Sequence, residues 1–159
     1  MTTFKRTHSG DSDFKNLVAL LDEGLRKLDG DDHAFYAQFN KVDNIDTVIV
    51  CYDDGKPTGC GAFKEYDQTK VEIKRMFVLP QNRGQGIGLD ILKALELWAA
   101  ELNYTGCILE TGKRQPEAIR MYKKAGYTII KNFGQYENDE NSVCMLKVIS
   151  PLSNPVLIA

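Results

Sequence analysis

The sequence predicts a single α/β domain built on a mixed, largely antiparallel sheet of six to seven strands, with about four helices. Segments with apolar residues at alternate positions predict strands, and segments with apolar residues three and four positions apart predict helices. Together they give the order β-α-α-β-β-β-α-β-α-β-β. The strand–helix–strand crossover in the second half requires a parallel pair of strands, whereas the short turns between the earlier strands require antiparallel pairing.

The first part of the chain predicts an edge strand, two helices and an antiparallel meander. Residues 2–9 form a short alternating strand, and Ser12 is placed to cap a helix with one apolar face. Residues 31–40 predict a second, short helix with acidic residues at its start. The meander has three strands, at residues 47–53, 57–67 and 70–79.

The second part alternates helices and strands. The longest predicted helix begins at Ile87 and ends near Leu102, and a shorter one occupies residues 115–126, with a proline near its start and a glycine at its end. Strands are predicted at residues 106–111, 127–132 and 142–148. We expect one domain over residues 1–149 and a C-terminal tail of residues 150–159, for which no element is predicted.

Composition excludes several classes of protein. A chain of 159 residues that is 43% hydrophobic can bury one substantial core. A net charge of −2 gives no general attraction to nucleic acid or to an anionic membrane. The four cysteines form no C-x-x-C pair and lie far from both histidines, which predicts buried thiols in a reducing compartment and no metal site. We expect a cytoplasmic protein, and the apolar tail is compatible with a homodimer.

Three glycines at alternate positions, Gly84, Gly86 and Gly88, lie between a strand and the longest helix. Such a segment is either a flexible turn or an anion cradle, in which backbone N–H groups and a helix N-terminus converge on a phosphate. A P-loop is excluded because Gly88 is followed by leucine and aspartate instead of lysine and serine or threonine. A dinucleotide fingerprint, with Glu110 as its ribose-binding acid, is excluded because position 89 is leucine and antiparallel strands come first.

The segment Arg83-x-x-Gly86-x-Gly88 resembles the acyl-CoA signature R/Q-x-x-G-x-G/A of the GCN5-related N-acetyltransferase (GNAT) superfamily. The order of elements resembles that fold over nearly the whole chain, and "QPEAIRMYKKAGY" resembles the family's tyrosine-containing helix, with Gln115 where many members have asparagine. The resemblance implies acetyl-CoA as co-substrate. It would be bound by the loop and by the strand before it: Met76, Phe77, Val78, Arg83, Gly84, Gln85, Gly86, Ile87 and Gly88.

The reaction that the resemblance implies is direct acetyl transfer to a primary amine in a ternary complex. An alkyl amine with a pKa near 10 is about one-thousandth free base at pH 7, so a base is useful. The resemblance places Glu72 as that base, on the same strand face as Lys74, Met76 and Val78 if alternation holds, and Tyr122 as the acid that protonates the leaving thiolate. A solvated strand glutamate and a core tyrosine are the alternative interpretations.

The acceptor site has five candidates: Asp32, His33, Tyr36, Arg75 and Tyr136. Asp32 could attract a cationic amine, His33 could relay a proton, and Tyr36 could shape the pocket. Arg75 could bind a substrate carboxylate, and Tyr136 lies on a long polar connection that could fold over the acceptor. Helix capping, surface exposure and loop packing remain alternative roles. A small-molecule amine or an amino acid is favoured over a protein N-terminus or lysine, because we expect no further domain that would recruit a protein. A non-catalytic acyl-CoA-binding module is the other alternative.

Overall fold

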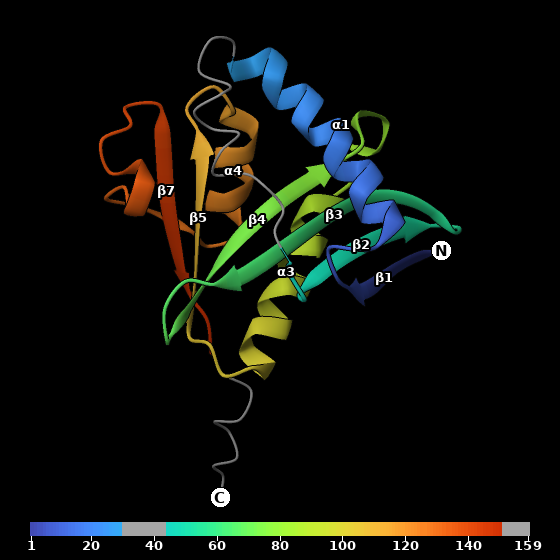
Figure 1. Ribbon diagram of the computed structural model, residues 1–159, viewed down its shortest axis with the longest axis horizontal. Helices are drawn as coiled ribbons and strands as arrows, with labels where there is room; N and C mark the ends of the chain where they lie inside the picture. Colours follow the sequence, from blue (N-terminus) through green and yellow to red (C-terminus); the bar gives the residue numbers. More distant parts are fainter. Residues whose placement is uncertain (30–43, 151–159) are drawn as a thin grey trace, which may run out of the picture.

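The computed structural model describes residues 1–29 and 44–150, in which seven strands form one sheet in the order β1-β2-β3-β4-β5-β7-β6 (Figure 1). The pair β4–β5 is parallel and the other five pairs are antiparallel, which confirms the predicted mixed, largely antiparallel sheet. The strands are β1 (Thr2–Thr7), β2 (Val48–Asp53), β3 (Lys56–Glu65), β4 (Lys70–Val78), β5 (Gly106–Gly112), β6 (Thr128–Ile130) and β7 (Ser142–Val148).

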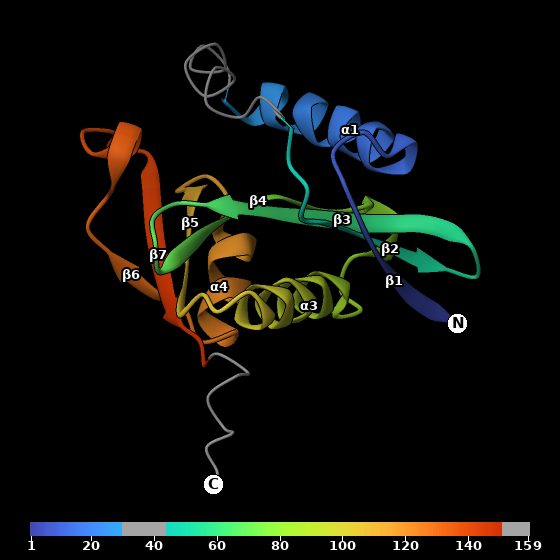
Figure 2. The same cartoon turned by 60° about the horizontal axis from the view of Figure 1, so that its bottom comes forward.

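Helices cover both faces of the sheet (Figure 2). Helix α1 (Ser12–Asp29) lies on one face, and α3 (Ile87–Glu101) and α4 (Pro116–Lys124) lie on the other. Two short 3-10 helices, η2 (Pro80–Asn82) and η3 (Gly134–Tyr136), lie in the connections. The helix predicted over residues 31–40 and the C-terminal tail from residue 151 lie outside the described residues. Among those described, no helix is both long enough and apolar enough to cross a membrane.

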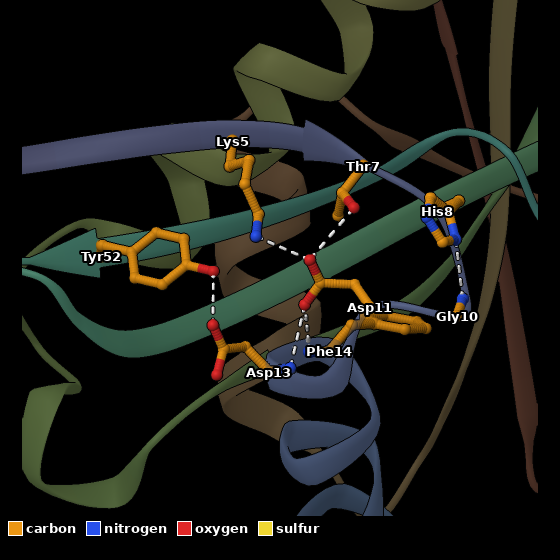
Figure 3. A network of polar contacts seen from close by, with 8 residues as sticks. All are labelled: Lys5, Thr7, His8, Gly10, Asp11, Asp13, Phe14 and Tyr52. Carbon is orange, nitrogen blue, oxygen red and sulfur yellow. Dashed lines mark hydrogen bonds and ion pairs between the residues drawn. The ribbon is translucent and has the colours of Figure 1, made fainter.

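The start of α1 corrects one prediction, because Asp11 and not Ser12 caps the helix (Figure 3). The Asp11 carboxylate accepts hydrogen bonds from the backbone N–H groups of Asp13 (2.9 Å) and Phe14 (3.1 Å). Burial alone would raise the pKa of Asp11, but hydrogen bonds from Lys5, Phe14 and Thr7 keep that pKa below its usual value. Lys5, at 2.6 Å from Asp11, thereby ties the edge strand β1 to the start of α1.

Strand β4 contains a β-bulge at Arg75. Cys60 and Ala62 of β3 lie opposite Phe77 and Lys74, so three residue steps on β4 match two on β3. Arg75 has φ of 60°, in the left-handed region, and is the extra residue that a bulge inserts.

The bulge changes which side chains share a face of β4. Val71 and Ile73 pack in the core under α3, and after the bulge so do Met76 and Val78. Glu72, between Val71 and Ile73, points to the opposite face, which α1 covers. The expectation that Glu72 shares a face with Met76 and Val78 is therefore wrong, because the inserted residue shifts the alternation by one position.

Strands β4 and β5 part soon after they meet. They pair only over residues 70–72 and 106–108, although β4 continues to Val78 and β5 to Gly112. Beyond this point the edge of β4 that faces β5 has no strand partner in the described part of the chain. Its backbone N–H and C=O groups can therefore pair with an extended ligand.

Candidate active site

The glycine loop follows directly from the end of β4. Gly84 and Gly86 both have φ of 82°, a conformation that glycine adopts without a steric penalty, and Gly86 is the residue that precedes α3. A Cβ atom built on either glycine would meet nothing within 4 Å, so the loop surface is open on that side. The first N–H groups of α3 have no partner within the helix, and with the helix dipole they form a site for an anion.

Gly88 has a different role from the other two glycines. It lies in the first turn of α3, and a Cβ atom there would lie 2.9 Å from the Met121 sulfur of α4. Glycine at this position therefore lets α4 approach α3 closely. Gly84 and Gly86 are thus needed for their positive φ angles, and Gly88 is needed for close packing of α3 against α4.

Arg83 is held at the mouth of the loop. Its Nε donates a hydrogen bond to the Val78 carbonyl at 2.8 Å, and its guanidinium carbon lies 5.6 Å from the centre of the Phe77 ring. The side chain is exposed, so its terminal nitrogens can still reach a phosphate. The loop residues Gln85 and Ile87 flank this charge, Gln85 exposed and Ile87 packed against the core.

We predict that Gly86→Ala weakens coenzyme A binding by about tenfold, since a side chain at positive φ costs about 1–2 kcal/mol and moves the N–H groups that face the anion. Isothermal titration calorimetry measures this effect. Gly24→Ala, in α1 and with open space around its Cβ, is the matched control and should leave the affinity unchanged. A folded Gly86→Ala protein with the affinity of the wild type would show that the loop does not bind the cofactor.

Two carboxylates lie on the α1 face of the sheet where β4 and β5 part. Glu72 of β4 is 5% exposed, and no described residue donates a hydrogen bond to it or forms an ion pair with it. Glu110 of β5 follows Leu109, which is in the core under α3, so Glu110 faces the same way as Glu72. Sequence reasoning missed Glu110 as a site residue, although the alternation along residues 107–110 could have predicted its face.

Glu110 is fixed by a polar contact across the sheet. The Ser142 hydroxyl of β7 lies 2.7 Å from a Glu110 oxygen and 3.0 Å from an oxygen of Asp139. A hydroxyl has one proton to donate, so this contact connects the two carboxylates through a single side chain. Glu72 has no such contact with the described residues and retains free lone pairs for an incoming donor.

Tyr136, which the sequence predicts on a loop near the acceptor, lies close to the carboxylates of Glu110 and Glu72. It ends η3, is 2% exposed, and packs edge-on against Phe133 at 5.9 Å between ring centres. Burial raises the pKa of its phenol, and the negative charges of Glu110 and Glu72 raise it further. Tyr136 therefore stays protonated at neutral pH and forms one wall of the site.

Tyr122 lies on α4, on the other side of the sheet, in the core cluster under α3. Its hydroxyl makes no hydrogen bond to any described residue, so its proton is free for another acceptor. Burial raises the pKa of Tyr122, and the charge of nearby Glu110 raises it further. The ring packs edge-on against Tyr127, at 5.9 Å between ring centres.

The ring beside Tyr122 is itself anchored by buried polar groups. The Tyr127 hydroxyl donates to Glu96 of α3 at 2.8 Å, and Lys147 of β7 donates to the other oxygen of Glu96 at 2.7 Å. This network joins α3, β7 and the residue that precedes β6. It holds the position of the Tyr127 ring and, through it, that of Tyr122.

The remaining predicted residues fall into two groups. Arg75 is buried and forms an ion pair with Asp22 of α1, at 2.8 Å. Asp32, His33 and Tyr36 lie outside the described residues. In the ranges 1–29 and 44–150, no group of three or more histidine, cysteine or acidic side chains is arranged to hold a metal ion.

The four cysteines are free and buried. Burial raises the pKa of the Cys144 thiol, which lies nearest the two carboxylates, to about 11, and Glu110 and Glu72 contribute to this rise. Burial likewise raises the pKa of Cys60 and of Cys107 to about 12. Since the thiolate is the nucleophile, none of these three is reactive at neutral pH.

These features fit an acyl-CoA. The open glycine loop at the start of α3 suits a pyrophosphate, and the unpaired edge of β4 at Met76, Phe77 and Val78 suits the amides of a pantetheine arm. Tyr122, with its unpaired hydroxyl, and the two carboxylates lie near the point where the strands part.

Comparison with known proteins gives the same class. The family model of the acetyltransferase (GNAT) domain matches residues 44–129. An IAA acetyltransferase of Azospirillum brasilense is 32% identical over 149 residues, which cover 89% of this chain and 96% of the relative. A crystal structure of a Klebsiella pneumoniae protein assigned as an acyl-CoA N-acyltransferase superposes with a TM-score of 0.79 at 31% identity, covering 94% of this chain and 98% of that one.

A more distant structure shows the same fold with its ligand. A GNAT family acetyltransferase of Elizabethkingia anophelis, solved with acetyl-CoA bound, has a TM-score of 0.67 at 19% identity, covering 93% of this chain and 98% of that one. The fold and the loop thus define an acyltransferase of the acyl-CoA-dependent class. The chain belongs to the GNAT family, and its enzyme class is that of the N-acetyltransferases.

Proposed function

We propose that this protein transfers an acetyl group from acetyl-CoA to the primary amine of a small molecule, directly and within a ternary complex. The observation that carries the proposal is the pair of carboxylates, Glu72 and Glu110, on one face of the sheet where β4 and β5 part, with Tyr122 close to Glu110. A protein that only bound acyl-CoA would need neither a carboxylate nor a phenol that makes no hydrogen bond to a described residue at this point.

The proposed mechanism assigns the base to Glu72. Glu72 is 5% exposed and its carboxylate accepts no hydrogen bond from a described residue, so it is free to take a proton from the acceptor's ammonium. The neutral amine then attacks the thioester that acetyl-CoA supplies. Glu110, already bonded to Ser142, adds negative charge that attracts the cationic amine.

Tyr122 is proposed as the acid. Its phenol donates a proton to the sulfur as the carbon–sulfur bond breaks, and the amide product and free coenzyme A leave. Two protons leave the nitrogen: Glu72 takes one from the ammonium, and the second, lost once the nitrogen has bonded to the carbonyl carbon, replaces the proton that Tyr122 gives to the sulfur. Glu72 then releases its proton to solvent, so one proton is released per turnover. The raised thiol pKa values support direct transfer over an acyl-cysteine route.

Turnover with a panel of amines tests the proposal. The protein is incubated with acetyl-CoA and each amine while free thiol is followed. We expect thiol release with small primary amines. Release with peptides alone would favour a protein acceptor, and coenzyme A binding without release would favour a binding module.

The four free, buried thiols support a reducing, cytoplasmic setting.

A further inference from the structure

Arg75 occupies a position in β4 that its backbone does not favour. Its φ of 60° lies in the left-handed region, which glycine and asparagine adopt at lower cost than arginine. The bulge could therefore form with another residue. A non-glycine residue held in this conformation suggests that its side chain has a role of its own.

The Arg75 side chain is buried and only partly paired. It is 5% exposed, and Nη1 donates to Asp22 at 2.8 Å, whose own side chain is 45% exposed. Nε is the one buried side-chain nitrogen or oxygen in the described part of the chain that has no hydrogen-bond partner. Nη2 likewise has no hydrogen bond to a described residue.

The unpaired nitrogens are those that bind a carboxylate. Nε and Nη2 form the side edge of the guanidinium, and their two parallel N–H groups match the two oxygens of a carboxylate. An unsatisfied buried donor on a charged group is costly, and a carboxylate ligand would remove that cost. Asp22 at Nη1 orients the guanidinium and leaves this edge without a hydrogen bond to a described residue.

Arg75 lies on the same side of the sheet as the proposed base. Its ion pair with Asp22 of α1 places the guanidinium on the face to which Glu72 points. Glu72 precedes it by three residues, or about 10 Å of strand at about 3.3 Å per residue. Both side chains are long enough to contact one small acceptor between them.

The last turn of α1 also reaches the loop after β5. Arg114 Nη1 donates to the Leu28 carbonyl at 3.1 Å, so α1 connects β4, through Asp22, with the segment that follows β5. The region between Arg75 and Glu110 is therefore bounded by the same helix at both ends. An acceptor bound there would have a cationic group at one end and carboxylates at the other.

We propose that the side edge of Arg75 binds a carboxylate of the acceptor, so that the substrates are small amines that also carry a carboxylate, such as amino acids. This inference rests on the proposed function and names its substrate class. The ammonium of the acceptor lies toward Glu72 and Glu110, and its carboxylate lies on Nε and Nη2 of Arg75. An amine without a carboxylate leaves Nε unpaired, so we expect it to be a poorer substrate than the matching amino acid.

Matched acceptor pairs test this inference. Each pair is an amino acid and the amine that lacks its carboxylate, for α-amino acids and for ω-amino acids of increasing length. For at least one pair, the wild type should show a kcat/KM at least tenfold higher with the amino acid. Arg75→Lys keeps the charge but loses the planar fork, and should lower kcat/KM for that amino acid by about 30-fold while changing the value for the amine less than about twofold.

Two further variants separate binding from folding. Arg75→Asn suits the left-handed backbone and should fold at least as well as Arg75→Lys, with the same loss of discrimination. Arg6→Lys alters an arginine that pairs with Glu101 on the surface, at 2.7 Å, and should leave the discrimination unchanged. Equal losses for both members of every pair would mean that Arg75 only joins β4 to α1, and would overturn the inference. A wild type without preference for any amino acid would also overturn it.

Binding measured without turnover distinguishes a failure of this inference from a failure of the proposed function. The same amino acids should raise the melting temperature of the wild-type complex with coenzyme A, and Arg75→Asn should abolish the rise. If amino acids raise the melting temperature of the wild type but not that of Arg75→Asn, and the protein acetylates none of the panel, the carboxylate site would be supported and the proposed reaction rejected. If amino acids do not raise the melting temperature of the wild type, and the protein acetylates the simple amines, the proposed reaction would be supported and the carboxylate site rejected.

Discussion

Tyr122→Phe should lower kcat by about 100-fold and leave coenzyme A affinity unchanged, since a positioned general acid contributes about 10²–10⁴-fold. The hydroxyl has no hydrogen bond to a described residue, so the substitution removes no structural contact that the structure describes. The ring, which carries the packing against Tyr127, is retained. Rapid-quench or steady-state kinetics with saturating acceptor measures the loss.

The pH dependence provides a second readout for Tyr122. Burial and the charge of Glu110 raise its pKa above the ordinary value of about 10, so the phenol keeps its proton throughout the neutral range. Activity that depends on this proton should therefore be lost only as the pH rises above about 10. A loss of activity that tracks a group titrating between pH 7 and 9 would not come from Tyr122.

Tyr127→Phe is the matched control for Tyr122→Phe. It removes a similarly buried phenol from the same cluster and leaves Glu96 with only Lys147, so it should lower the free energy of unfolding by about 1–2 kcal/mol. We expect a much smaller effect on kcat. Equal losses of kcat in the two variants would mean that Tyr122 acts through packing, and an unchanged rate in Tyr122→Phe would remove it from the mechanism.

Glu72→Gln should lower kcat/KM for an alkyl amine by about 100-fold at pH 7, because only about one-thousandth of such an amine is free base at that pH. The deficit should shrink as the pH approaches 10, since the amine then loses its proton without help. A pH–rate profile of wild type and variant, with the amine in varied concentration, measures both effects. Glutamine preserves the size of the side chain in its buried position.

Glu110→Gln is the comparison variant for Glu72→Gln. Glu110 is already bonded to Ser142, so its substitution should reduce the attraction for the cationic amine and lower kcat/KM by about tenfold, mainly through KM. A larger loss of kcat in Glu110→Gln than in Glu72→Gln would transfer the role of base to Glu110. If the loss of kcat/KM does not depend on pH in either variant, neither Glu72 nor Glu110 takes the proton from the amine.

Much of the fold could be predicted because local patterns agree with the tertiary structure. The glycine loop, the start of α3 at Ile87 and all seven strands follow from short-range periodicity and turn residues. The cap of α1 was misplaced by one residue because Asp11 and Ser12 are both good cap residues, and it is the contacts of Asp11 with Lys5 and Thr7 of β1 that favour Asp11.

The site was less predictable because it depends on how strands pair. The residues that follow Arg75, at positions 76–79, are all apolar, so alternation does not say which of them face the core, and the face predicted for Met76 and Val78 was wrong. Glu110 joins Glu72 only through the short parallel pairing of β4 and β5, which one sequence does not specify. The contact of Gly88 with Met121 joins two helices that are distant in sequence, and no local pattern predicts it.

The central claim is direct transfer of the acetyl group from the thioester to the amine. A single turnover with acetyl-CoA labelled with ¹³C at the carbonyl, followed by mass spectrometry of the amine, the coenzyme and the intact protein, tests it most directly. We predict that the label appears in the amide product in a one-to-one ratio with free coenzyme A, and at no time on the protein. Label on a cysteine of the protein, or label that remains on coenzyme A with every amine, would contradict the account.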